Sequence, residues 1–390
     1  MKRAIWILLV LGLLTGCTSQ QPQPVTDTTT LATEPLSTPA TTAQQTEPVE
    51  VVATQPRSPA EALLQSMTLE EKVGQLFLAA HTEKTAAEDI STYHLGGYIL
   101  FGSFFRARTL ETAAADIAAF QQQTKIPLLI AVDEEGGTVN RVSCYHQYRH
   151  GEFASPRELY AQGGLTAILE SEQEKCELLC SLGINVNMAP VCDITTNTAS
   201  FMYKRSLGAS AEETAAFVTG VADVMAHSGI GAVLKHFPGY GDNVDTHTGI
   251  AVDDRTLIQL ESADLVPFMA GIEADCDAIL VSHTFINCLD REYPATLSPK
   301  VHRYLRGIMG FDGVIVTDEL SMQAITDLYG VEEAAVLAVL AGNDLLCTQD
   351  YALQYGAVLE AARSGRIPEE LVDQAVMRIL QWKYDLGLLG

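Results

Sequence analysis

The stretch Gly313-Val-Ile-Val-Thr317-Asp318 is a short apolar run that ends in a carboxylate, and seven other short apolar runs are spaced along the chain. Longer amphipathic stretches lie between them, for example at residues 109–123, 165–182, 211–227 and 331–341. Short continuous apolar runs that alternate with helices indicate a parallel sheet covered by helices. We therefore predict eight strands, at residues 74–79, 97–101, 127–133, 185–191, 233–237, 278–283, 313–318 and 344–348.

Eight such strands fit an α/β protein of the (β/α)8 barrel type, with a doubly wound open sheet as the alternative. In a barrel the active site is built at the carboxyl ends of the strands, whereas an open sheet concentrates its ligands at one switch point. The stretch Asp133-Glu-Glu-Gly136-Gly137 lacks the glycine spacing of a dinucleotide site. Polar residues at several predicted strand ends favour the barrel: Asp133, Asp193, Lys235, His236, Ser282, His283 and Asp318.

The beginning of the chain is typical of an export signal. Lys2 and Arg3 precede an apolar stretch at residues 4–14, which is shorter than the roughly 20 residues that a spanning helix needs. The sequence Leu14-Thr-Gly-Cys17 resembles a bacterial lipobox, in which the cysteine is acylated and becomes the mature N-terminus. We predict a lipoprotein signal peptide at residues 1–16 and a lipid on Cys17 that holds the protein at the extracytoplasmic face of the bacterial membrane. The alternative is an ordinary secretory signal with a chance cysteine.

The next segment, residues 17–57, consists mainly of Thr, Gln, Pro, Ser and Ala and has almost no aromatic residues. Such a segment cannot bury enough apolar surface to fold, so we predict a disordered linker behind the lipid anchor. Residues 58–390 have a length that is normal for an α/β barrel, and we predict a single catalytic domain there.

The charge and the cysteines narrow the possible partners. The net charge is −25, and it becomes −27 when Lys2 and Arg3 leave with the signal. This argues against nucleic acid as a partner, because phosphate binding needs clustered Lys and Arg. Seven of the eight cysteines remain besides Cys17, an odd number that cannot pair completely within the chain. Their spacing matches no zinc pattern, and we expect most of them to be buried as small apolar residues.

The stretch from Lys235 to Gly249 is the richest in candidate chemistry. It leaves a predicted strand and carries a proline and two glycines before Asp245-Thr-His247 and a third glycine after it, a composition that suits a loop over a pocket. Asp245 and His247 are two residues apart and would point the same way in an extended segment. A carboxylate beside an imidazole fixes its tautomer and favours its charged form, which suits a general acid near neutral pH. The alternative is a surface loop with a local hydrogen bond.

Asp318 is the candidate nucleophile. A carboxylate at the carboxyl end of a buried strand faces the site in a barrel, where it could attack an anomeric carbon. The alternative is an N-cap for the following helix, since Asp is favoured at that position. We expect the neighbouring Glu319 to point to the other side.

Five further residues are candidate sugar ligands, and each has a structural alternative. Lys235 and His236 at a strand end could bind sugar hydroxyls or form salt bridges at the rim. Asp133 and Arg141 flank the Gly-Gly turn and could form a structural pair. Arg205, in Tyr203-Lys-Arg-Ser-Leu-Gly208, could bind the sugar or be a solvated loop arginine.

Together these motifs resemble glycoside hydrolase family 3, and within it the single-domain β-N-acetylglucosaminidases. The resemblance runs from Thr68-Leu-Glu-Glu-Lys-Val-Gly-Gln75 to about Lys383. Its motifs are Asp133-Glu-Glu-Gly-Gly-Thr-Val-Asn-Arg141, Asn185-Val-Asn-Met-Ala-Pro-Val-Cys-Asp193, Lys235-His-Phe-Pro-Gly with Asp245-Thr-His247, and the stretch from Gly313 to Met322.

The resemblance implies a (β/α)8 barrel and a role for each candidate. Asp318 is implied as the nucleophile, and His247 as proton donor and later base, with Asp245 as its partner. The implied sugar-binding positions are Asp133, Arg141, Arg205, Lys235 and His236. The family's β-glucosidases take a carboxylic acid/base from a second domain. Because this sequence ends at Gly390, soon after the expected last helix, we expect no such domain and assign the acid/base role to the histidine.

The sequence departs from the family pattern in the catalytic loop. The segment between Gly241 and Asp245 is one residue shorter than in the commonest version. Tyr240 stands where His is frequent, and Thr138 replaces a frequent Arg. These differences concern the geometry of the loop and the contacts of the flanking sugar, and they leave the nucleophile and the Asp245/His247 pair in place.

We therefore predict a retaining exo-β-N-acetylglucosaminidase that acts on terminal N-acetylglucosamine-type sugars, from cell-wall-derived muropeptides or other glycans. Two protein groups supply the chemistry, so no metal or cofactor is expected. Two alternatives remain: an enzyme in which phosphate or another sugar intercepts the glycosyl intermediate, and a non-catalytic glycan-binding lipoprotein.

Overall fold

A computed structural model of the chain describes residues 58–246 and 249–389. The predicted signal peptide, the linker, Cys17 and His247 lie outside the described residues. No helix within the described ranges is long and apolar enough to cross a membrane. The seven cysteines of the described part are free thiols, and four of them are buried, as expected for most: Cys176, Cys192, Cys276 and Cys347.

Eight parallel strands form one sheet in the order β10-β1-β2-β3-β4-β5-β7-β9. A parallel bridge between Val316 and Leu345 joins the last strand to the segment that enters the first, so the sheet curves round into a barrel. This confirms the predicted (β/α)8 class and excludes the open sheet. The strands are β1 (Phe77–Ala80), β2 (Gly97–Leu100), β3 (Leu129–Val132), β4 (Val186–Asn187), β5 (Gly231–Phe237), β7 (Ala278–Val281), β9 (Val314–Thr317) and β10 (Leu346–Thr348).

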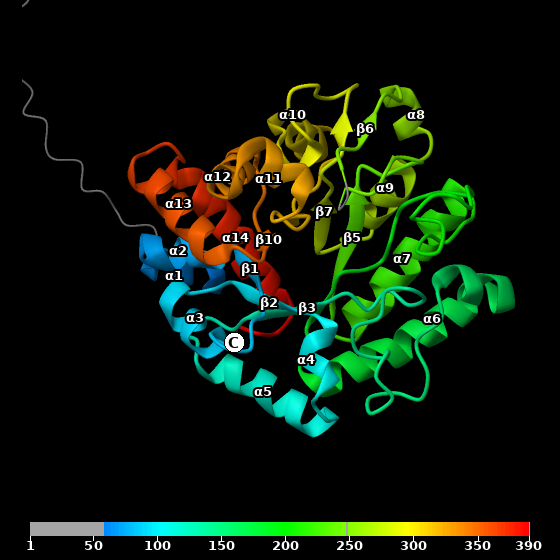
Figure 1. Ribbon diagram of the computed structural model, residues 1–390, viewed down its shortest axis with the longest axis horizontal. Helices are drawn as coiled ribbons and strands as arrows, with labels where there is room; N and C mark the ends of the chain where they lie inside the picture. Colours follow the sequence, from blue (N-terminus) through cyan, green and yellow to red (C-terminus); the bar gives the residue numbers. More distant parts are fainter. Residues whose placement is uncertain (1–57, 247–248, 390) are drawn as a thin grey trace, which may run out of the picture. The chain divides into compact units, whose positions relative to one another are not determined.

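Helices lie around the outside of the strands in Figure 1. The longer ones are α5 (Leu110–Gln122), α6 (Pro156–Leu182), α7 (Ala211–His227), α9 (Leu265–Glu273), α12 (Val331–Ala341), α13 (Tyr351–Arg363) and α14 (Glu369–Asp385). The shorter ones are α1 (Pro59–Ser66), α2 (Leu69–Gln75), α3 (Ala86–Tyr93), α4 (Gly102–Arg106), α8 (Leu257–Glu261), α10 (Pro299–Arg303), α11 (Gln323–Tyr329), η1 (Ala295–Leu297) and η2 (Tyr304–Ile308).

Local side-chain chemistry explains where several helices begin. Before α7, the Ser210 hydroxyl accepts the N–H of Glu213, and the Glu213 carboxylate accepts the N–H of Ser210. This capping box satisfies two backbone donors that would otherwise be unpaired. Ser155 and Glu158 form the same arrangement before α6, which begins nine residues before the predicted start at residue 165 and is kinked at Gly163 and Gly164.

The structure corrects three details of the prediction. The first strand begins at Phe77 and not at residue 74, because the Thr68/Glu71 capping box starts α2, which extends to Gln75. β4 has two residues in place of the predicted seven, and Pro190, which cannot donate a backbone hydrogen bond, lies in the predicted remainder. A separate two-stranded sheet, β6 (Val252–Asp253) with β8 (Phe285–Ile286), was not expected.

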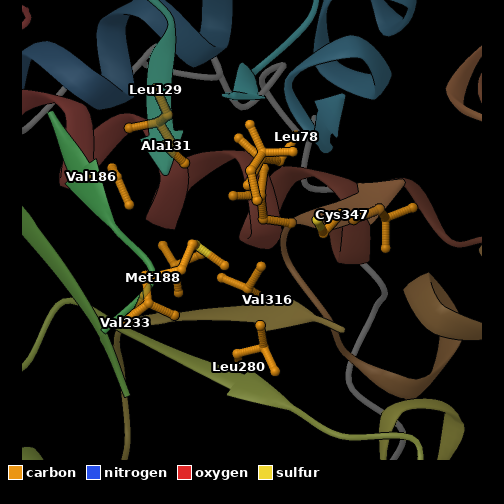
Figure 2. Packing of buried hydrophobic residues seen from close by; sticks show 14 of the residues in the cluster. Leu78, Leu129, Ala131, Val186, Met188, Val233, Leu280, Val316 and Cys347 are labelled. Atoms are coloured by element: carbon orange, nitrogen blue, oxygen red, sulfur yellow. The ribbon is translucent and has the colours of Figure 1, made fainter. Parts of the chain in front are cut away.

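The interior of the barrel is filled by side chains. Figure 2 shows them converging from different strands: Leu78, Leu129, Ala131, Val186, Met188, Val233, Leu280, Val316 and Cys347. All of them are buried. Alternate residues of each strand point inward, so the barrel is a packed core rather than a pore. A ligand must therefore bind above this core, where the strands end.

Candidate active site

A cavity of about 600 Å³ lies at the carboxyl ends of the strands. Six of the residues proposed from the sequence line it together: Asp133, Arg141, Arg205, Lys235, His236 and Asp318. Another cavity, of about 480 Å³, lies near the amino ends of β7 and β9 and is lined by residues such as Asp277, Asp312 and Trp382. None of the proposed site residues lines that second cavity, which agrees with the general rule that barrel chemistry occurs at the carboxyl end.

Lys235, near the end of β5, holds two carboxylates in place. Its Nζ lies 2.7 Å from Oδ1 of Asp133 and 2.7 Å from Oε1 of Glu135. Burial alone would lower the pKa of the Lys235 ammonium, but the charges on Asp133 and Glu135 raise it above its ordinary value. The other oxygen of Asp133 lies 3.8 Å from Nη2 of Arg141. The buried lysine is therefore kept charged, and it orients Asp133 at the edge of the cavity.

Glu135 is a site residue that the sequence analysis did not select. Its carboxylate accepts hydrogen bonds from Nε of Arg205 at 2.9 Å and from Nη2 of Arg205 at 2.7 Å. Burial alone would raise the pKa of Glu135, but the charges on Arg205 and Lys235 hold it well below its ordinary value. The signal was present in the sequence, because residues two apart in an extended segment point the same way and Glu135 lies two residues after Asp133.

The Gly-Gly turn lets the chain after β3 fold back on itself. Gly136 and Gly137 have φ values of 97° and 64°, in the left-handed region that favours glycine. A Cβ on Gly136 would also lie 2.4 Å from the carbonyl oxygen of Ala154. Beyond the turn, the buried carboxylate of Glu134 accepts hydrogen bonds from the backbone of Arg141, Val142 and Ser143. These bonds fix the segment that carries Arg141 to the cavity.

His236 is oriented by Asp193, in the segment that follows β4. Oδ2 of Asp193 lies 2.8 Å from Nδ1 of His236 and also accepts the His236 backbone N–H. A carboxylate accepts hydrogen bonds, so Nδ1 carries the proton, and Nε2 faces Nη2 of Arg205 at 3.2 Å. The imidazole is therefore held in one tautomer between an acid and a guanidinium. The polarity that its ring presents at the cavity is therefore fixed.

Asp318 follows β9 directly, and its carboxylate lines the cavity. Its Oδ1 accepts the N–H of Glu319 at 2.9 Å, and its Oδ2 lies 3.5 Å from the hydroxyl of Tyr240. Asp318 does not cap a helix, since α11 begins at Gln323 with Met322 as its N-cap. The alternative role that we considered for Asp318 is therefore wrong.

Glu319 also lines the cavity, which corrects the expectation that it points to the other side. The strand ends at Thr317, so the alternation of side chains no longer applies at this position. Its Oε1 accepts the N–H groups of Ser321 and Gln349 and joins the loops that follow β9 and β10. Burial raises the pKa of Glu319 above its ordinary value. We assign it a structural role at this wall.

The loop after β5 carries the proposed acid/base pair. Asp245 is half-buried and Thr246 is fully buried, whereas His247 lies outside the described residues. Tyr240, in the same loop, is buried, and its hydroxyl lies 2.6 Å from Oγ1 of Thr246. In the part of the chain that the structure describes, no group of three or more His, Cys, Asp and Glu residues is placed to hold a metal ion.

The sequence matches the family model described as the glycosyl hydrolase family 3 N terminal domain over residues 68–382. The chain belongs to glycosyl hydrolase family 3. This confirms the family resemblance seen in the sequence motifs, and the matched range includes every site residue discussed above.

Relatives of this family 3 chain include the β-hexosaminidase LpqI of Mycobacterium tuberculosis. That protein is 31% identical over 325 residues, which cover 80% of this chain and 82% of the relative. The solved structure of M. tuberculosis LpqI superimposes on this chain with a TM-score of 0.77 at 28% identity. The match covers 84% of this chain and 97% of the LpqI chain. A family 3 β-N-acetylglucosaminidase from Paenibacillus sp. str. FPU-7 has a TM-score of 0.78 at 34% identity, with 83% of this chain and 63% of that chain covered.

Proposed function

We propose that this family 3 chain is a retaining exo-β-N-acetylglucosaminidase with Asp318 as its nucleophile and the Asp245/His247 pair as its acid/base. The relatives are β-hexosaminidases and β-N-acetylglucosaminidases, and the chain is a glycosidase of this type. The observation that supports the proposed roles is the position of Asp318 at a strand end, in a cavity shared with Lys235 and Arg205.

In the first step, a carboxylate oxygen of Asp318 forms a bond to the anomeric carbon while the glycosidic carbon–oxygen bond breaks. The electron pair of the broken bond goes to the leaving oxygen, which takes a proton from His247. In the second step, His247 takes a proton from water, the water oxygen bonds to the anomeric carbon, and the ester to Asp318 breaks. Two inversions give net retention of configuration.

The remaining cavity residues are suited to bind the terminal sugar. Asp133 is held in place by Lys235 and can accept hydrogen bonds from sugar hydroxyls. Arg141, Arg205 and His236 add charged or fixed polar groups around the same cavity. Because partners already hold Asp133, Arg205 and His236 in place, the site needs little reorganisation when the sugar enters.

The proposed nucleophile can be tested by trapping. The purified domain is incubated with a fluorinated N-acetylglucosaminide that slows the second step, and the protein is digested and analysed by mass spectrometry. We expect a glycosyl adduct on the peptide that contains Asp318, and no adduct in Asp318→Ala. An adduct on another residue would refute the assignment.

The proposed reaction can be tested by product analysis. Aryl N-acetylglucosaminide, glucoside and xyloside are compared, with and without phosphate. We expect release of free N-acetylglucosamine in both buffers. A sugar 1-phosphate as the main product would show phosphorolysis, and binding of sugars without release of any product would show a glycan-binding protein.

We further propose that the enzyme is an extracytoplasmic lipoprotein, with lipid on Cys17 and residues 17–57 as a tether, and that it acts in peptidoglycan turnover. The support is the Leu14-Thr-Gly-Cys17 sequence behind a short apolar stretch. Expression of the full chain in a bacterium with labelled palmitate should label the protein and place it in the membrane fraction. Cys17→Ala should abolish the label and release the protein, and labelled Cys17→Ala protein would refute this proposal.

A further inference from the structure

The hydroxyl of Tyr240 lies between the side chains of Thr246, in the same loop after β5, and Asp318. It is 2.6 Å from Oγ1 of Thr246 and 3.5 Å from Oδ2 of Asp318. Both Tyr240 and Thr246 are buried, with 1% and 0% of their surfaces exposed. Water therefore has little access to this pair of hydroxyls, and the short bond between them joins two residues of one loop beside the nucleophile.

The direction of these hydrogen bonds follows from the chemistry of the partners. Asp318 must be ionised to act as a nucleophile, and an ionised carboxylate only accepts hydrogen bonds. Burial, and then the charge on Asp318, raise the pKa of Tyr240 well above its ordinary value, so its hydroxyl keeps the proton. Tyr240 therefore donates to Asp318, and Thr246 donates to Tyr240. The three side chains form a chain of donors that ends at the nucleophile.

The phenol ring cannot easily leave this position. The Tyr240 backbone N–H donates to Oδ1 of Asp193 at 2.7 Å. The ring packs edge-to-face against Phe201, with centroids 4.9 Å apart, and against His236, with centroids 5.2 Å apart. Asp193 also orients His236, so one carboxylate fixes both the sugar-ligand candidate and the tyrosine beside the nucleophile.

We propose, on the basis of the proposed function, that Tyr240 is a positioning residue for Asp318. The hydroxyl chain from Thr246 through Tyr240 to the Asp318 carboxylate keeps the nucleophile ionised and fixes its orientation. The bond from Tyr240 is strongest while Asp318 carries its charge, because hydrogen bonds to ions are stronger than those to neutral groups. The charge disappears when Asp318 becomes a glycosyl ester. The charge returns when the ester is hydrolysed, so the bond from Tyr240 strengthens again in that step. The hydroxyl chain therefore assists hydrolysis of the intermediate as well as orienting the ionised Asp318 for attack.

Other groups around Asp318 also influence its ionisation. Among the residues that the structure describes, those that line the same cavity or act on its charge include Asp133, Glu135, Arg141, Arg205, Lys235, His236, Glu319 and Cys347. None of these residues changes in the variants below. A shift of the acid limb of the pH–rate profile between wild type and variant therefore reports the removed hydroxyl.

The test uses Tyr240→Phe, which keeps the ring and its packing and removes only the hydroxyl. Tyr203→Phe is the matched control, because the hydroxyl of Tyr203 makes no hydrogen bond within the described residues and its ring stacks on Arg157. Rates on an aryl N-acetylglucosaminide are measured from pH 4 to 9. We expect Tyr240→Phe to lower kcat/KM about tenfold and to shift the acid limb of its pH profile upward by roughly half a pH unit. We also expect it to slow the hydrolysis of a preformed glycosyl-enzyme, because the charge returns to Asp318 in that step.

Thr246→Val and Thr246→Ser test the other end of the chain. The valine keeps the shape and removes the donor, so it should reproduce part of the Tyr240→Phe effect, and the serine should restore the wild-type profile. An unchanged acid limb in Tyr240→Phe, even with a slower enzyme, would overturn the positioning role. A wild-type profile in Thr246→Val would overturn the hydroxyl chain. A wild-type enzyme that releases no N-acetylglucosamine would instead refute the proposed function itself.

Discussion

Arg205 and Glu135 form a two-pronged ion pair, with Nε and Nη2 of the arginine 2.9 Å and 2.7 Å from the two carboxylate oxygens. Lys235 lies 2.7 Å from one of these oxygens and bridges to Asp133. Two acids and two bases are thus paired at the carboxyl end of the barrel. Removal of one member would leave a buried charge unpaired, which typically costs about 3–5 kcal/mol. The site is therefore built as one electrostatic unit.

Arg205→Lys should raise KM by roughly tenfold or more and lower the thermal midpoint. A lysine keeps the charge but cannot make the planar two-pronged bond to Glu135, nor reach His236 with the same geometry. Steady-state kinetics on an aryl N-acetylglucosaminide and a thermal melt measure both effects.

Arg149→Lys is the matched control for this substitution. Arg149 makes the same two-pronged pair, with Glu174, but does so at the surface. Exposed pairs contribute about 1 kcal/mol or less, so this variant should resemble wild type. Equal effects of the two substitutions would show that the buried pair has no special role in the site.

Glu134→Gln should destabilise the protein and weaken substrate binding through Arg141. The Glu134 carboxylate accepts backbone bonds from Arg141, Val142 and Ser143, and an amide offers one acceptor oxygen where three N–H groups converge. Each donor left unpaired in a buried site costs about 1–3 kcal/mol. We expect a lower unfolding free energy in denaturant and a raised KM, with kcat changed least.

Glu152→Gln provides the comparison for this prediction, since Glu152 is exposed on the segment that follows. Glu152→Gln should leave the unfolding free energy and KM unchanged. If Glu134→Gln lowered stability but left KM at the wild-type value, the segment that holds Arg141 would not be part of the sugar site.

His247→Ala should slow turnover by an amount that depends on the leaving group of the substrate. A proton donor is needed for a poor leaving group, such as a sugar hydroxyl, and hardly at all for an activated phenolate. We expect a loss of about a hundredfold or more on the natural type of linkage, and a much smaller loss in the first step on a nitrophenyl glycoside. Equal losses on both substrates would contradict the proton-donor role.

The sequence predicted the barrel and the residues that belong to its strands better than those in its loops. Asp133, Lys235 and Asp318 were found because each falls at or near the end of an apolar run, where the period of a strand fixes direction and burial. Tyr240 was not selected as a site residue, because it follows a strand end and loop folding brings it to the cavity. Glu135 was also not selected, although its position two residues after Asp133 was a signal for it. The predicted direction of the Glu319 side chain was wrong because strand alternation stops at Thr317. The role of His247 stays a prediction.

Lys383→Met should change how the stability of the protein depends on pH. Lys383, on α14, is fully buried, and its Nζ donates to Oε1 of Gln75 at 2.6 Å. Burial lowers the pKa of Lys383 to about 7. The unfolded chain has a lysine pKa of about 10.4, so between these values it binds a proton that the folded protein does not. The resulting penalty is absent above about pH 10.4 and grows as the pH falls toward 7.

The measurement is the unfolding free energy in urea at pH 7.5 and 9.5 for wild type and Lys383→Met. From about pH 7.5 to 9.5, the unfolding free energy of the wild type should rise by about 2–3 kcal/mol relative to that of the variant. Proton linkage gives about 1.4 kcal/mol for each pH unit. The variant also lacks the hydrogen bond from Lys383 to Gln75. This loss lowers its unfolding free energy equally at both pH values and therefore cancels in the comparison. Lys125→Met is the control, because Lys125 is exposed and should give a curve parallel to wild type. A parallel curve for Lys383→Met as well would mean that Lys383 stays charged inside the folded protein.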